Sequence, residues 1–268
     1  MSLNKRLDEA RAAYKNKDKN AAALAHTKSA ITESAPEEHG GANSQYIGSI
    51  VYGGLDGVVT TFAAVSGVAG AALGSNVILI MGLANLLADG LSMAVGSYLS
   101  GKSEKEYYER ERARESWEVD NFPDGEKEEL FTVYSGQGYT FEEASAMVET
   151  ISRDKGRWVD AMMLQELGLV KDEKKPLTSA LATFGAFALA GLVPLLVYLI
   201  GLSTPIPGNL AFTISIGLSA LTLFLLGAAK VKVTGLNPWR SGLEMLLVGG
   251  AAGLVAYLVG VALKGLGV

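Results

Sequence analysis

Residues 176–229 read PLTSALATFGAFALAGLVPLLVYLIGLSTPIPGNLAFTISIGLSALTLFLLGAA, a run of 54 positions without Lys, Arg, Asp or Glu. A helix that is apolar on all sides lies either in the core of a large protein or in lipid. A bilayer core about 30 Å thick requires roughly 20 mostly apolar residues per helix. The run is long enough for two such helices, separated by the Pro- and Gly-containing turn at 203–208. These residues therefore predict an integral membrane protein.

The same length criterion finds five spans along the chain. They cover residues 46–73, 76–100, 176–201, 209–229 and 238–263. Seven basic residues precede the first span and twelve lie in 102–175, whereas the loops at 73–76 and 202–208 contain none. Positively charged loops stay in the cytosol, so we expect a cytosolic N-terminus and a C-terminus on the opposite side. The first 45 residues are polar, and we expect a tail with a short amphipathic helix over residues 3–17 and no signal peptide.

Charge is concentrated between the second and third spans. Of the 23 basic and 28 acidic residues, 12 and 19 lie in 102–175. The expected fold class is therefore an all-α membrane protein, with five transmembrane helices and a helical cytosolic domain inserted between helices 2 and 3. The expected domains are a polar cytosolic tail at 1–45, the first two transmembrane helices at 46–101, the insert at 102–175 and the last three transmembrane helices at 176–268.

The residue types that are missing exclude several functions. Cys is absent, and both histidines, His26 and His39, lie in the polar tail. A disulfide, a thiolate metal site, a Cys nucleophile and a Ser-His-Asp triad in the folded part are therefore excluded. The sequence pI of about 5.2 and the lack of a basic stripe argue against a nucleic-acid partner. We expect neither enzymatic activity nor a prosthetic group.

The insert has the pattern of four helical segments. Residues 102–119 contain no Gly or Pro, and they predict a continuation of the second span as one rod into the cytosol. The sequence NFPDG at 121–125 interrupts the rod. Thr140 followed by Glu143 is a capping-box pattern, and Gly168 is a helix-ending residue. The later helices are predicted over 125–135, 140–152 and 154–167.

Three sets of side chains in these helices have the spacing of metal ligands. They are Glu115 with Glu118, Glu126 with Glu129, and Met162 and Met163 with Glu166. Residues three or four apart on a helix face the same side, so each set offers its oxygen or sulfur atoms to one ion. Carboxylates suit Mn²⁺, Mg²⁺ and Ca²⁺, whereas thioether sulfur favours softer metals. On spacing alone, the alternative for the acids is surface charge pairing with basic residues of the same helices, and the alternative for the methionines is core packing. The basic residues are Arg110, Arg112, Arg114 and Lys127.

Ionisable residues inside the spans form a second set of candidates. Asp56 and Asp89 are the charged residues within the first two spans. A charge in the bilayer is costly and marks a functional site by default. Asn85, Asp89 and Met93 are four residues apart, so they share one helix face. A structural hydrogen bond to a neighbouring helix is the alternative for both aspartates.

Several separated motifs resemble the vacuolar iron transporter family. They are YGGLDGVVTT at 52–61, ADGLSMAVGSYLS at 88–100, EKEYYE at 104–109 and WVDAMMLQELG at 158–168. The motifs occur in the family's order, and the resemblance covers about residues 46–265. It implies a homodimeric transporter in the lipid bilayer that moves Fe²⁺, or Mn²⁺ in some members, out of the cytosol in exchange with protons.

The resemblance also implies metal-binding roles for particular residues. The ligands of the cytosolic metal-binding domain would fall on Glu115, Glu118, Glu126, Glu129, Met162, Met163 and Glu166, and the membrane path on Asp56 and Met93. The chain departs from the family pattern at Asn85, where some members have an acidic residue, and at Asp89, where many have a small one. Asp89 is included as a further path candidate because it lies inside the second span.

Other functions are compatible with the same residues. One is a passive divalent-cation channel or a membrane-anchored metal sensor. Another is a ferroxidase-like enzyme, although helical di-iron sites normally include histidines, which this insert lacks. The lack of a recognisable eukaryotic sorting element favours a prokaryotic plasma membrane, with a vacuolar membrane expected if the source is eukaryotic.

Overall fold

The computed structural model describes residues 5–33, 44–234 and 237–264, and within these ranges its regular elements are all helices. The chain divides into two compact units, Met1–Ile47 and Gly48–Val268. The first unit, which the sequence predicts to be a polar tail, contains α1 (Lys5–Asn16), α2 (Lys19–Ala25) and α3 (Lys28–Glu33). The carboxylate of Asp18 caps α2 by accepting two backbone N–H groups of its first turn.

Among the described residues, five helical segments of the second unit are long and apolar enough to cross a membrane, as the sequence predicts. They are α4 (Ile47–Gly70), α5 (Ser75–Asn121), α9 (Pro176–Leu192) continued by α10 (Leu196–Ile200), α11 (Gly208–Thr234) and α12 (Pro238–Lys264). The short turn η1 (Ser44–Tyr46) precedes α4. Proline is the first residue of α9 and of α12. The N–H groups of the first helical turn have no partner within the helix, so a residue without an N–H group is tolerated there.

The third span contains an interruption that the hydropathy pattern does not reveal. Val193–Leu195 forms a 3-10 turn, η3, between α9 and α10. Pro194 has no N–H, and its ring clashes with the carbonyl of the preceding turn, so a regular α-helix does not continue through it. The Pro194 carbonyl accepts a buried hydrogen bond of 2.8 Å from Ser215 Oγ on α11. A neighbouring helix thus satisfies a polar group at the break, as the bilayer requires.

Glycines let the membrane helices pack at close range. A Cβ atom at Gly57 of α4 would lie 2.2 Å from the carbonyl oxygen of Phe187 on α9. One at Gly260 of α12 would lie 2.0 Å from the carbonyl oxygen of Gly67. Both distances are far below van der Waals contact, so glycine is required at these positions. Such close approach of backbones is how helices associate in lipid, where tails are as apolar as the side chains.

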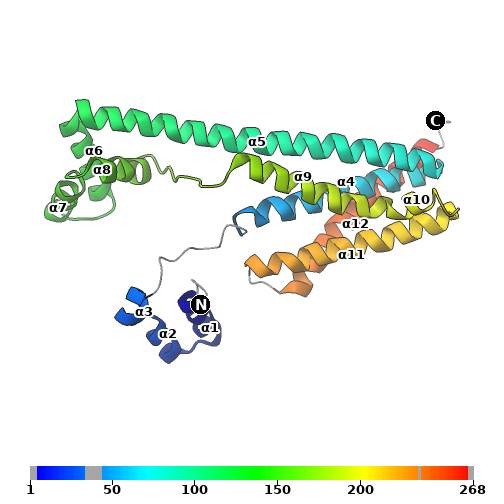
Figure 1. Ribbon diagram of the computed structural model, residues 1–268, viewed down its shortest axis with the longest axis horizontal. Helices are drawn as coiled ribbons and strands as arrows, with labels where there is room; N and C mark the ends of the chain where they lie inside the picture. Colours follow the sequence, from blue (N-terminus) through cyan, green and yellow to red (C-terminus); the bar gives the residue numbers. More distant parts are fainter. Residues whose placement is uncertain (1–4, 34–43, 235–236, 265–268) are drawn as a thin grey trace. The chain divides into compact units, whose positions relative to one another are not determined.

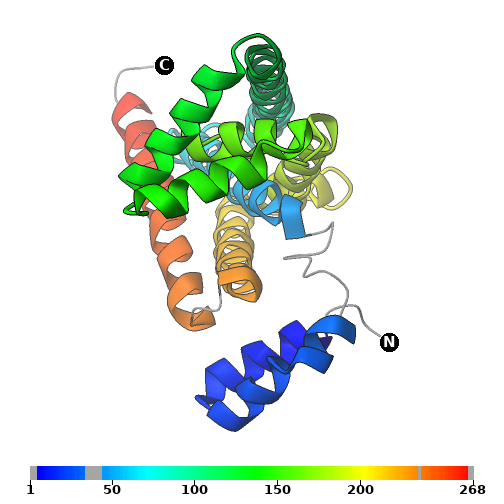
Figure 2. The ribbon, with the colours of Figure 1, turned by 90° about the vertical axis from the view of Figure 1, so that its left-hand side faces the viewer.

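The insert is built on the second half of α5. Ser75–Asn121 is one uninterrupted helix of 47 residues, which confirms the predicted rod (Figure 1). The remaining elements are α6 (Pro123–Gly136), α7 (Phe141–Ile151), α8 (Lys155–Ala161) and the π-helical turn η2 (Met162–Glu166), drawn in green in Figure 2. The break after α5 is shorter than expected, because proline is well suited to the first turn of a helix and α6 already begins at Pro123.

Local signals set the ends of the later helices. Thr140 Oγ1 accepts from the Glu143 N–H, and the Glu143 carboxylate accepts from the Thr140 N–H, which confirms the predicted capping box. Gly168 follows η2 with a φ of +64°, a left-handed value that favours glycine. The π-helical geometry of η2 was not predicted, since an α-helix was expected up to residue 167. Leu130 and Met162 are buried in the core of the insert.

Candidate metal centre

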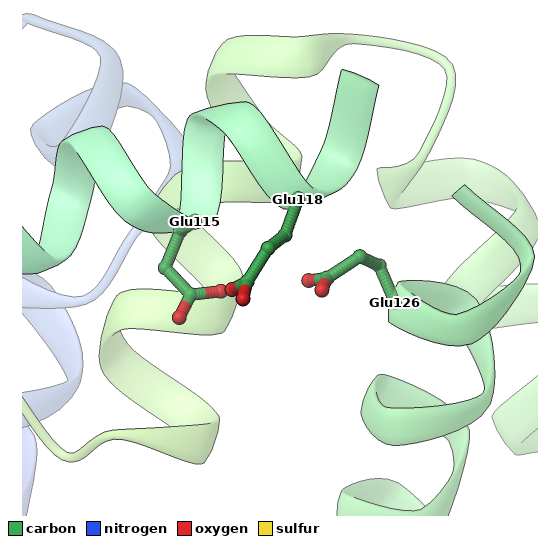
Figure 3. A group of neighbouring side chains, drawn as sticks. All are labelled: Glu115, Glu118 and Glu126. Carbon is green, nitrogen blue, oxygen red and sulfur yellow. The ribbon is translucent and has the colours of Figure 1, made fainter. Parts of the chain in front are cut away.

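Three glutamates of the insert meet in one place. Glu115 and Glu118 lie one turn apart on α5, and the chain turns at Phe122 so that Glu126, in the first turn of α6, faces them. One carboxylate oxygen from each lies within 4.8 Å of the others. Figure 3 shows the three side chains turned toward one another. Carboxylates this close repel one another unless a cation or a proton lies among them.

Two of the three carboxylates are withdrawn from water. Glu115 is 1% exposed and Glu126 is 4% exposed. Neither oxygen of Glu115, nor Oε2 of Glu126, has a hydrogen-bond partner among the described residues. A carboxylate buried without a donor is strongly unfavourable, and buried charges are normally paired or bound to metal. The solvated-surface interpretation therefore does not describe these two acids, whereas it fits exposed pairs such as Lys102 with Glu106.

Arg114 supplies a positive charge beside the acids. Its Nη2 lies 2.6 Å from Glu115 Oε1, and its Nη1 lies 2.5 Å from Glu118 Oε2. Its Nε donates to Glu111 at 3.1 Å. The contact with Glu115 is an ion pair without hydrogen-bond alignment, so Glu115 still lacks a donor despite the short distance. One guanidinium contacts two of three clustered carboxylates, so the neutralisation of the cluster is incomplete.

Burial and mutual repulsion favour protons on the cluster. The pKa of Glu126 is raised to about 7, first by burial and then by the negative charges of Glu115 and its neighbours. Burial also raises the pKa of Glu115, against the opposing attraction of Arg114. Partial loss of hydration at its carboxyl group, followed by repulsion from Glu129, raises the pKa of Glu166. A divalent cation among these carboxylates would relieve the repulsion and release protons.

The other predicted ligands lie around the three-glutamate cluster rather than in it. Glu129 and Glu166 are exposed and outside the 4.8 Å group, yet close enough to repel its buried members electrostatically. Met162 and Met163 are 0% and 1% exposed and belong to the core of the insert, which fits the packing interpretation. Both methionines and Glu166 lie in η2, and π-helical turns often occur at functional sites.

Comparison with known proteins identifies the family. A model of the VIT family matches residues 47–261, which include the whole insert and nearly all of the five spans. The chain belongs to the VIT family. A vacuolar iron transporter of Toxoplasma gondii is 40% identical over 265 residues, covering 95% of this chain and 87% of the relative. One of Plasmodium falciparum is 35% identical and covers 98% of both chains. Vacuolar iron transporter 1 of Arabidopsis thaliana is 34% identical, covering 86% of this chain and 90% of the relative.

Membership of the VIT family confirms the resemblance carried by the sequence motifs. The relatives are named as transporters, which agrees with the prediction that the chain is not an enzyme. The ferroxidase-like alternative receives no support from them. The family match and the five apolar helices together make the chain a multi-pass membrane protein.

In this VIT-family chain the predicted path residues lie on α4 and α5. Asp56 and Asp89 are partly buried and close enough to repel each other. Met93, one turn from Asp89, lines a cavity of about 520 Å³ together with Tyr52 of α4. Thr60 Oγ1 donates to the backbone carbonyl of Asp56 at 2.8 Å.

The sequence predicts Arg114 only as a partner in surface charge pairing, and it does not single out Glu111. Arg114 precedes Glu118 by four residues, and Glu111 precedes Arg114 by three, so both have the spacing of helix-surface pairs. The same spacing recurs along α5 at Arg110 and Arg112. Spacing alone therefore does not distinguish the arginine that touches buried acids from those that meet exposed ones.

Proposed function

We propose that this chain transports ferrous iron across a membrane and out of the cytosol, in exchange with protons. The observation that carries the proposal is a cluster of three carboxylates in which Glu115 and Glu126 are buried, while the described residues show the Arg114 guanidinium in contact only with Glu115 and Glu118 of the three. Such acids are destabilising unless a cation compensates them. Relatives that cover most of the chain are named vacuolar iron transporters, which supports iron as the cation.

The insert, residues 102–175, is proposed to be a cytosolic metal-collecting domain, and residues 1–45 a cytosolic tail, because both are rich in basic residues. In the insert, the carboxylates proposed to bind the metal ion first are those of Glu115, Glu118 and Glu126. The set is completed by Glu129, Met162, Met163 and Glu166. Thioether sulfur beside carboxylates suits Fe²⁺ better than Mg²⁺ or Ca²⁺, and the oxygens also suit Mn²⁺, which we propose as a second cargo.

The membrane path is proposed to run from the insert to Met93 and then between α4 and α5 to Asp56 and Asp89. Glu115 and Met93 lie on the same continuous helix, so α5 links collection to passage. As the metal leaves Asp56, a proton from the far side takes its place, because a carboxylate in the bilayer needs a cation or a proton to neutralise it. Two copies of the chain are proposed to form a homodimer that encloses the path.

The membrane is proposed to be vacuolar. The relatives from Toxoplasma gondii and Arabidopsis thaliana have "vacuolar" in their names. The preference for a prokaryotic plasma membrane, drawn from the lack of a sorting element, receives no support from these relatives. Localisation of a fluorescently tagged full-length chain in its own cells tests this assignment, and a signal confined to the plasma membrane would contradict it.

Metal flux in proteoliposomes tests the transport proposal. Purified protein is reconstituted, and the movement of Fe²⁺, Mn²⁺, Co²⁺ and Zn²⁺ is followed with a dye inside the vesicles, with and without an opposing proton gradient. The expected result is Fe²⁺ flux that rises severalfold with the gradient and moves protons in the opposite direction. Flux that ignores the gradient would favour a passive channel, and binding without flux would favour a membrane-anchored sensor.

A further inference from the structure

Arg114 holds two of the three carboxylates that form the cluster. Its guanidinium lies 2.6 Å from an oxygen of Glu115 and 2.5 Å from an oxygen of Glu118. Oxygens of the same two residues, with one from Glu126, lie within 4.8 Å of one another. A metal ion and the guanidinium therefore compete for the same negatively charged groups, because both are attracted to the lone pairs of the carboxylates.

Arg114 also has a partner outside the cluster. Its Nε lies 3.1 Å from Glu111 Oε2, one turn earlier on α5. Arg110 contacts the other oxygen of Glu111 at 2.8 Å, and hydrogen bonds from the two arginines lower the pKa of that carboxyl. Glu111 therefore stays ionised. A guanidinium displaced from the cluster keeps a charged partner on its own helix.

We propose that Arg114 is a built-in competing cation, which weakens metal binding at the cluster and speeds metal release. The inference rests on the proposed function, because it concerns the affinity of the proposed metal site. Without metal, the guanidinium partly neutralises Glu115 and Glu118. A divalent ion displaces it toward Glu111. Without such a competitor, clustered and partly buried acids would hold a divalent ion tightly, since attraction is strong where water is excluded.

Two features favour competition over a purely structural role. Arg114 Nη1 donates a hydrogen bond to Glu118 Oε2, but its contact with the buried Glu115 lacks hydrogen-bond alignment, so the arginine does not fix the orientation of the Glu115 carboxylate. The Arg114 side chain is 44% exposed, whereas that of Glu115 is 1% exposed. The arginine therefore has room to leave while the acid stays in place.

Arg114→Gln tests the proposal by calorimetric titration of the full-length protein in detergent with Mn²⁺. The expected result is binding about tenfold tighter, which corresponds to about 1.4 kcal/mol. In the flux assay KM falls and the maximal rate also falls, because release is slower. Weaker or unchanged binding would overturn the proposal, since an arginine that only positions the acids would produce that result.

Two further variants make the result specific to this arginine. Arg153→Gln removes an exposed pair with Glu149 elsewhere in the insert, and it should leave affinity and flux unchanged. Arg114→Lys keeps the charge and should bind Mn²⁺ within about twofold of the wild type. If the Gln variant does not fold, tenfold tighter binding by the Lys variant would overturn the proposal, because the charge would not be what competes.

Glu111 provides a test with the opposite sign. Glu111→Gln removes the alternative partner of Arg114, so Mn²⁺ binding should weaken severalfold. In the Arg114→Gln background the same change should have little effect, since the interaction it acts through is gone. Equal weakening in both backgrounds would overturn the exchange of partners.

A wild-type protein that binds neither Mn²⁺ nor Fe²⁺ would contradict the proposed function itself, whereas metal binding that Arg114→Gln leaves unchanged contradicts only this inference.

Discussion

The insert and the membrane-spanning helices differ in the number and the grouping of their acidic residues. The insert has 19 acidic residues, and it brings three of them together, two of which contact the same arginine. The first two spans have only Asp56 and Asp89, on two different helices. A domain in water can gather acids, because basic side chains and solvent balance most of them. The bilayer core offers neither solvent nor many basic side chains. An acid within a span is therefore stronger evidence of a functional site than an acid in the insert.

Removal of the membrane acid should give the largest effect and separate the two regions. Asp56→Ala is expected to reduce Fe²⁺ flux on the order of 100-fold, because α4 has no other carboxylate. Mn²⁺ binding by the insert should be unchanged. Flux in proteoliposomes and titration in detergent measure the two effects separately. Thr222→Ala, which removes a hydroxyl bonded to a carbonyl one turn earlier on α11, is the control and should keep its flux. Full transport by the Asp56 variant would remove this residue from the path.

Loss of one buried acid in the insert should have a smaller effect, and it should change metal binding, which the Asp56 variant leaves unchanged. Glu115→Gln is expected to weaken Mn²⁺ binding on the order of tenfold while the thermal stability stays equal or rises, because a buried charge is replaced by a neutral group of the same shape. Titration and thermal unfolding measure these effects. Glu142→Gln, an exposed acid in the first turn of α7, is the control. Unchanged affinity in the Glu115 variant would leave the cluster without a role in capture.

The insert should respond to pH near neutrality. The pKa of Glu126 is about 7 in the folded chain, against an ordinary value of 4.5. Between these values the folded chain holds a proton that the unfolded chain has lost. The free energy of unfolding of the metal-free insert should therefore fall as pH rises from 4.5 to 7, and then level off.

Metal binding should follow the opposite course, because protons compete with the ion and leave as pH rises. Mn²⁺ affinity is thus expected to increase severalfold between about pH 6 and pH 8. Thermal unfolding and titration across this range measure both trends. Glu126→Gln should flatten both curves. Profiles that stay steep in this variant would assign the response to another group.

The smallest effect should come from a helix cap that lies away from both sites. Thr140→Ala removes the hydroxyl that accepts from the Glu143 N–H at 3.3 Å. The free energy of unfolding of the insert should fall by about 1 kcal/mol. Metal affinity should not change, and Thr140→Ser should restore stability. Reduced affinity in the alanine variant would show that the cluster depends on how firmly α7 is held.

Much of the fold could be predicted from the sequence because its signals are local. The five spans follow from long apolar runs, and the rod follows from a stretch of α5 without Gly or Pro. The break at Pro194 was missed, because hydropathy averages over it. The π-helical turn η2 was missed too, because its residues have no pattern that separates an α-turn from a π-turn. In the first 45 residues, α1 matches the short helix predicted over residues 3–17, whereas α2 and α3 were not predicted because the segment is polar.

The sequence by itself determined which segments are apolar enough to cross a bilayer and which residue types are present for chemistry. Whether a helix can cross a bilayer depends on the combined hydrophobicity of roughly 20 consecutive residues, which can be read directly from the sequence. The tertiary structure decided which acids lie next to one another. Glu115 and Glu126 lie on different helices, and they meet because the chain turns at Phe122 while the core around Leu130 holds α6 against α5. Contact between distant residues depends on packing across the domain, which no short stretch of sequence contains.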